Sequence, residues 1–157
     1  MISKREGLVL IEFGNTLYAA GGENGVSILN TVERFDPRTG SWYNCAPMGY
    51  RRRYFGAVIL DNKIYCVGGS DYDEDLATVE CFEARANRWI PVPSMSRRRE
   101  SVGVVCAEGK LFAMGGACRN KETDTVEVFD PVVNKWDDYI PLPHACEGMV
   151  ALTLING

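Results

Sequence analysis

The chain has 157 residues, with 17 Lys and Arg against 21 Asp and Glu, and therefore a formal net charge of -4. This balance and a hydrophobic fraction of 46% are typical of a globular domain, and they exclude both a generally basic nucleic-acid surface and an apolar-poor disordered chain. The longest apolar runs are far shorter than the roughly 20 residues that cross a bilayer, and residues 1–6 do not resemble a secretion signal. We therefore expect a soluble, cytoplasmic protein.

Four markers recur at a constant interval of 47 residues. They are the glycine pairs Gly21-Gly22, Gly68-Gly69 and Gly115-Gly116, the tryptophans Trp42, Trp89 and Trp136, the Val-Glu pairs that begin at residues 32, 79 and 126, and Phe35, Phe82 and Phe129. All three tryptophans share one phase without insertion or deletion, so the chain is an internal repeat. The glycine pairs and tryptophans are expected to have structural roles.

Each repeat predicts four short strands. The first strands are nearly all apolar, which favours burial on both faces, and they span residues 8–13, 55–60 and 102–107. Tight turns follow, and the second strands, at 17–20, 64–67 and 111–114, end at the glycine pairs, where a neighbour can lie directly on the backbone. The third strand alternates, as in residues 31–35, which indicates one buried face and one wet face.

The fourth strand of each repeat begins at its tryptophan. The preceding turns carry Gly40, Asn87 and Asn134 in one phase, and these residue types enter the left-handed region at little cost. Four antiparallel strands in tandem repeats of this length predict the blades of an all-β propeller, and no helical periodicity competes with them.

The 47-residue repeat of this chain resembles the Kelch repeat. The resemblance rests on the glycine pair, an aromatic residue thirteen positions later and a tryptophan seven positions after that, and it covers the whole chain. WD-repeat propellers are the nearest alternative family, but the Gly-His and Trp-Asp dipeptides of that family are absent from the matching blade positions. The family more often has tyrosine where this chain has Phe35, Phe82 and Phe129.

The resemblance also implies an architecture. We expect three blades, at residues 1–48, 49–95 and 96–142, with residues 143–157 adding the first strand of an incomplete fourth blade. Kelch-like propellers usually close with six blades, so the chain resembles half of a ring. Either it is part of a longer protein, or two copies form a homodimer that completes the ring, because an open half exposes strand edges.

Catalytic and metal-binding patterns are absent from the sequence. The six cysteines, at 45, 66, 81, 106, 118 and 146, do not form closely spaced ligand pairs, and His144 is the single histidine. No nucleophile elbow or phosphate loop is present, and the acidic run at residues 71–75 lacks the ligand order of a calcium loop. Galactose oxidase shares the propeller type, but this chain cannot supply its copper ligands. We expect no enzyme, no metal and no cofactor.

The repeats differ most in two sets of loops, which an up-and-down blade places at the same end. One set precedes the first strands at residues 4–6, 51–53, 97–99 and 145–147, and the other follows the glycine pairs at 23–27, 70–75 and 117–121. Arginines concentrate in two of these loops. They either pair with residues 71–75 and Glu100 or form a bidentate site for an acidic partner peptide.

The resemblance favours the second alternative, because arginines of this loop contact partner peptides in Kelch-like adaptors. The candidate partner-binding residues are Arg5, Arg51, Arg52, Tyr54, Tyr72, Arg98, Arg99 and Ser101. Arg52 and Arg99 match the pattern best, whereas Cys146 replaces the arginine in the fourth loop.

The predicted function is therefore a non-enzymatic module for protein–protein interaction. The resemblance implies that the parent protein is an adaptor that brings substrates to a cullin-based ubiquitin ligase through domains that this chain does not contain. An actin-binding, cytoskeletal Kelch protein is the alternative.

Overall fold

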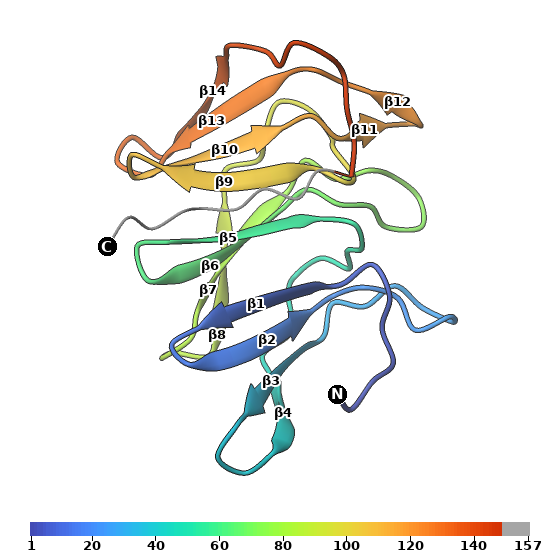
Figure 1. Cartoon of the computed structure of the whole chain (residues 1–157), viewed down its shortest axis with the longest axis vertical. Coiled ribbons are helices and arrows are strands. Elements are labelled where there is room, and N and C mark those ends of the chain that lie inside the picture. The colour runs from blue at the N-terminus through green and yellow to red at the C-terminus, as the bar shows by residue number, and fades with distance from the viewer. Residues whose placement is uncertain (149–157) are drawn as a thin grey trace.

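The computed structural model describes residues 1–148, and those residues form strands, turns and loops without a helix. Three antiparallel sheets of four strands follow one another along the chain (Figure 1). The first sheet contains β1 (Val9–Phe13), β2 (Thr16–Ala20), β3 (Val32–Asp36) and β4 (Ser41–Cys45). The second contains β5 (Gly56–Leu60), β6 (Lys63–Val67), β7 (Val79–Glu83) and β8 (Arg88–Val92). The third contains β9 (Gly103–Ala107), β10 (Lys110–Met114), β13 (Val126–Asp130) and β14 (Lys135–Tyr139).

The predicted all-β fold is confirmed, and the strand boundaries lie within one residue of the predicted ones. Each sheet lies within one of the three predicted blades. A two-stranded ribbon of β11 (Ala117–Cys118) and β12 (Lys121–Glu122) was not predicted, because each of its strands is too short for periodicity to be visible. Residues 143–148 carry no strand, and the rest of the predicted fourth-blade strand lies outside the described residues.

The turn between the first two strands of each blade fixes their register. The loop of Gly14 and Asn15 joins Phe13 to its partner Thr16, and both loop residues have positive φ, at 61° and 58°. The corresponding pairs at residues 61–62 and 108–109 share this conformation. Two positive φ values in a two-residue hairpin match the twist of the strands, which explains why Gly, Asn and Asp occupy these positions so often.

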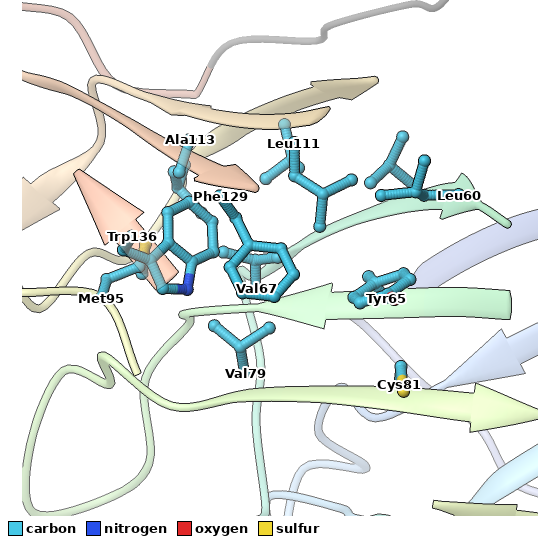
Figure 2. Packing of buried hydrophobic residues seen from close by; sticks show 13 residues of the cluster. Leu60, Tyr65, Val67, Val79, Cys81, Met95, Leu111, Ala113, Phe129 and Trp136 are labelled. Atoms are coloured by element: carbon cyan, nitrogen blue, oxygen red, sulfur yellow. The ribbon is translucent and has the colours of Figure 1, made fainter. Parts of the chain in front are cut away.

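The apolar core lies between adjacent blades. One cluster joins blades 1 and 2 around Tyr18, Phe55 and Phe82. A larger cluster joins blades 2 and 3, where Phe129 and Trp136 lie close to Val67 and Met95 (Figure 2). Because each sheet buries its faces mainly against its neighbours, every blade depends on an adjacent blade for stability.

The first strand of the first blade corrects one expectation. Burial on both faces was predicted for all three first strands, but in β1 Leu10 is 54% exposed. Val9, Ile11 and Phe13 pack against the core that β1 shares with blade 2, and Leu10 points to the face that no described blade covers. The apolar pattern is therefore that of an inner strand, although only one of its two faces has a neighbour here.

Candidate partner-binding face

The two variable sets of loops lie at one end of the blades and the tight hairpin turns lie at the other. In Figure 1 the loops are on the right and the β1–β2, β5–β6 and β9–β10 turns are on the left. We call the right-hand end the loop face; it is formed by residues 4–7, 23–28, 50–54, 70–76, 97–101 and 117–122.

Below the loop face, each blade contains a buried arginine that holds its own loop to the sheet. In blade 2 the Arg52 side chain is fully buried. It donates hydrogen bonds to the carbonyl oxygens of Gly68 (2.6 Å) and Thr78 (3.1 Å) and pairs with the carboxylate of Glu80 (2.8 Å). Such charge-assisted bonds are stronger than neutral ones, particularly away from water.

The same arrangement, which we call the arginine clasp, occurs in all three described blades. The ion pairs are Arg5–Glu33 at 2.8 Å, Arg52–Glu80 at 2.8 Å and Arg99–Glu127 at 3.1 Å, each with side chains at most 5% exposed. Thr31, Thr78 and Thr125 accept from the same guanidinium groups through carbonyl and hydroxyl oxygens. The clasp is therefore part of the repeat.

The clasp corrects the predicted role of Arg5, Arg52 and Arg99. These three were expected to contact a partner, but their guanidinium groups point into the blade and are occupied by carboxylate and carbonyl oxygens. Breaking such a pair would leave a buried charge uncompensated, which is costly. The sequence correctly places these arginines in the loop before each first strand. The expectation that their side chains point outward to a partner was wrong.

The acidic partners of the clasp lie on the third strands, for which one buried face and one wet face were predicted. Glu33, Glu80 and Glu127 are at most 4% exposed, and each is paired with the clasp arginine of its blade. Glu33 also accepts hydrogen bonds from the backbone N–H groups of Ile2 (2.6 Å) and Ser3 (3.0 Å). Burial alone would raise the pKa of Glu33, but the hydrogen bonds from Arg5, Ile2 and Ser3 outweigh it and lower the pKa.

The glycine pairs allow the backbone of neighbouring loops, including that of the next blade, to lie directly against their own backbone. The N–H of Gly69 donates to the carbonyl oxygen of Arg99 at 2.8 Å, and a Cβ at Gly69 would lie 2.7 Å from the carbonyl oxygen of Arg53. The N–H of Gly116 donates in the same way to Cys146, also at 2.8 Å. Cys146 thus keeps the backbone role of the arginine that it replaces. The structural reason for the glycines is close approach of backbone to backbone.

A chain of hydrogen bonds crosses the loop face from blade to blade. The N–H of Tyr54 donates to Gly7 at 2.9 Å, and that of Ser101 donates to Tyr54 at 2.6 Å. Gly148 continues the chain by donating to Ser101 at 3.1 Å. All four residues have positive φ, between 51° and 67°. This conformation is unfavourable for tyrosine and serine, and strained backbone of this kind concentrates at functional sites.

The loops of the loop face are tied to one another. The Tyr72 hydroxyl accepts a hydrogen bond from the N–H of Ile28 (2.8 Å) and donates one to the carbonyl of Val26 (2.9 Å), so it joins the loops of blades 1 and 2. Arg98 pairs with Glu74 and thereby joins the loops of blades 3 and 2. These bonds fix the loops relative to one another, so the face is organised before any partner arrives.

The remaining predicted residues stay at the surface. Arg51 is exposed and forms no ion pair among the described residues. Tyr54 is 41% exposed and Tyr72 is 57% exposed. Arg98 is half-exposed and pairs with Glu74. Of the two alternatives considered for the arginines, this is pairing with the acidic loop at residues 71–75, not a free site for an acidic peptide. Arg53, which sequence reasoning did not select, pairs with Glu23 at 2.6 Å and lies over the Tyr54 ring.

The tryptophans connect each blade to the previous one. The indole N–H of Trp89 donates to the carbonyl of Ala46 at 2.9 Å, and that of Trp136 donates to Pro93 at 2.8 Å. Each indole also packs on its own blade's phenylalanine, as in the Phe82–Trp89 pair with centroids 5.0 Å apart. The Trp42 indole forms no hydrogen bond within the described residues.

Within residues 1–148, no group of three or more His, Cys, Asp or Glu side chains is arranged to hold a metal ion. The same residues contain no helix long and apolar enough to span a membrane. Burial raises the pKa of the Cys66 thiol to about 12, and the pKa values of Cys45, Cys81, Cys106 and Cys118 are also raised, mainly by burial. None of these five thiols has the lowered pKa of an activated nucleophile.

Sequence reasoning missed the acidic half of the clasp. The signal was present, because Glu33, Glu80 and Glu127 each lie 28 residues after the clasp arginine of their blade, with a threonine two positions before the glutamate. A buried polar pair with a constant spacing can be found by aligning the repeats, but only the structure shows that the two side chains point toward each other.

Sheets of four antiparallel strands, stacked through their faces with inner strands side by side, define the chain as part of a β-propeller. Residues 2–147 match the KLHDC2/KLHL20/DRC7 Kelch-repeats domain, and the chain belongs to this family. It is a Kelch-repeat domain of the kind that binds other proteins.

Curated proteins and solved structures that are similar to parts of the chain include the following three. Human Kelch-like protein 4 is 40% identical over 45 residues, which are 29% of this chain and 6% of that protein. The mouse influenza virus NS1A-binding protein homolog is 43% identical over 56 residues, 36% of this chain and 9% of that protein. The structure of YjhT superimposes with a TM-score of 0.80 at 16% identity, covering 92% of this chain and 55% of the other. The last similarity supports the propeller fold alone.

Proposed function

We propose that the chain recognises a protein partner through its loop face and takes no part in catalysis. The observation that carries the proposal is the cross-linked set of loops, in which Tyr72 and Arg98 each join two blades while Arg51 and Tyr54 remain exposed. A rigid surface that presents aromatic and arginine side chains is typical of protein interfaces, because little conformational entropy is lost on binding.

A hollow of about 540 Å³ lies at the end of the blades opposite the loop face, between the hairpin turns of blades 1 and 2. Its charged groups are partly satisfied within the chain, since Lys63 pairs with Glu83 at 3.2 Å. Two of the turns that line it, β1–β2 and β5–β6, are two-residue hairpins, whose geometry leaves little freedom for variation. We therefore assign partner recognition to the loop face.

We further propose that the parent protein is a cytoplasmic adaptor that presents the bound partner to a cullin-based ubiquitin ligase. The support is the family and the similarity to human Kelch-like protein 4. Because the matched segments cover only 6% and 9% of the two curated relatives, the ligase-binding domains would lie in other parts of such a protein.

The experiment compares the partners captured by the parent protein with and without changes in the loop face. Arg51→Ala combined with Tyr54→Phe removes an exposed cation and a hydroxyl without disturbing the clasp, and Lys110→Ala at the opposite end is the control. The proposal expects the loop-face variant alone to lose a captured partner, and that partner's ubiquitylation to fall with it. Equal loss in the control, or no loss in the loop-face variant, would refute recognition through this face.

A further inference from the structure

A hollow of about 400 Å³ lies on the loop face between the loops of blades 2 and 3. We call it the acidic groove. Its carboxylates are Asp71, Asp73, Glu74, Asp75 and Glu100. A second hollow of about 250 Å³ is lined by residues of the same loop.

The carboxylates of the groove outnumber the cations available to them. Three arginines also line it, but Arg53 is paired with Glu23 outside the groove, and Arg98 is paired with Glu74. Only Arg119 contributes a guanidinium without an ion pair within the described residues.

The remaining acids form no ion pair with a described residue, although Arg53 also interacts with Glu100 at longer range. Asp75 accepts the backbone N–H of Arg119 at 2.7 Å. Asp71 accepts the N–H of Tyr72 at 2.8 Å, and neither Asp71, Asp73 nor Glu100 forms an ion pair within residues 1–148. The groove thus retains an excess of negative charge, which favours a cationic ligand.

A second observation comes from Ser70, which lines the same groove and is only 4% exposed. Its backbone is satisfied, because its N–H and carbonyl both bond to Arg53, at 2.9 and 3.1 Å. Its hydroxyl oxygen, by contrast, is buried without a hydrogen-bond partner among residues 1–148. A buried hydroxyl without a partner is costly, and a ligand carbonyl that reaches the groove would accept its proton.

We propose that the acidic groove binds a basic segment of the partner protein. An Arg or Lys side chain of that segment pairs with Asp71, Asp73 and Glu100. A backbone carbonyl of the same segment accepts a hydrogen bond from Ser70. The inference rests on the proposed function and assigns a charge to the partner. That charge is opposite to the acidic peptide expected from the sequence, because two of the arginines behind that expectation, Arg52 and Arg99, are buried.

The test selects random displayed peptides on the full chain and measures the affinity of the best synthetic peptide by fluorescence anisotropy. The proposal expects enrichment of Lys and Arg, with weaker binding at higher ionic strength. Asp71→Asn with Asp73→Asn should reduce affinity about tenfold or more. Asp61→Asn with Glu108→Gln, which changes the charge equally at the opposite end, should leave affinity unchanged.

Ser70→Ala separates a ligand contact from a structural role. Because the hydroxyl has no hydrogen-bond partner in the described part of the chain, the substitution should leave the melting temperature unchanged or slightly raised and should still reduce affinity about fivefold.

The outcomes distinguish the inference from the proposed function. Loop-face peptides that are neutral or acidic, or basic peptides that bind the Asp71→Asn, Asp73→Asn variant as tightly as the original chain, overturn the inference and leave loop-face recognition intact. Selection of peptides that bind only at the hairpin-turn end overturns both.

Discussion

At the scale of single residues, the surface and buried arginines of the loop face have opposite roles although they are neighbours in sequence. Arg98 is half-exposed and paired with an exposed carboxylate, whereas Arg99 is fully buried in a clasp. Exposed ion pairs contribute little to stability, while removing one partner of a buried pair is strongly destabilising. The three consecutive arginines 97–99 therefore cannot be treated as one basic patch.

Replacing Arg52 with Ala should lower the free energy of unfolding by about 3–5 kcal/mol, because Glu80 would remain buried without its counterion. Replacing Arg98 with Ala should change it by about 1 kcal/mol or less. Urea denaturation of both variants measures the difference. Similar values for the two substitutions would contradict a structural clasp.

The clasp also predicts a dependence of stability on pH. The pKa of Glu33 is lower in the folded chain than its ordinary value, so its contribution is complete above that ordinary value and is lost as the pH falls through the folded pKa. Stability should therefore decline from about pH 5 to about pH 3. Glu33→Gln should decline less over the same interval in denaturant melts. An identical decline in both proteins would remove Glu33 as a source of the dependence.

At the scale of elements, repetition made the strands predictable. The spacing of 47 residues places every glycine pair and tryptophan in phase, and the strands begin and end within one residue of the positions it implies. Alternation and turn chemistry depend on short stretches of chain, so they can be read from sequence. The direction of Arg52 depends on Gly68, Thr78 and Glu80, which lie 16 to 28 residues away, and no local pattern contains that information.

The indoles allow a comparison between blades. Trp89→Phe should lower the free energy of unfolding by about 1 kcal/mol more than Trp42→Phe, because the Trp89 indole donates to a carbonyl of the preceding blade and the Trp42 indole donates to no described residue. Trp89→Ala should cost about 3–5 kcal/mol, because it also leaves a void beside Phe82. Thermal and urea melts provide the measurement. Equal costs for the two Phe variants would mean that the bond between blades does not contribute.

At the scale of the whole molecule, the three blades repeat the same interior contacts and differ in their loops at one end. Clasps, glycine pairs and inter-blade hydrogen bonds recur in each blade, so they fix where the loops emerge. The loops themselves differ, from the Tyr72 contact in blade 2 to the β11–β12 ribbon in blade 3. This division lets one scaffold carry different recognition surfaces, since changes in the loops leave the core intact.

The position of the loop face could be predicted from the sequence, but which of its side chains are exposed could be predicted only in part. The sequence identified the loop face because two connections of an up-and-down blade emerge at one end. It also selected Arg51, Tyr54 and Tyr72, which the structure leaves exposed. It could not identify Ser70 or the charge of the acidic groove, because both depend on which carboxylates the arginines already neutralise.

The most direct test of recognition through the loop face is hydrogen exchange of the chain with and without its captured partner. Recognition through the loop face predicts slower exchange at residues 50–54, 70–76, 97–101 and 117–122, with no change at the hairpin turns 14–15, 61–62 and 108–109. Protection confined to those hairpin turns would contradict it.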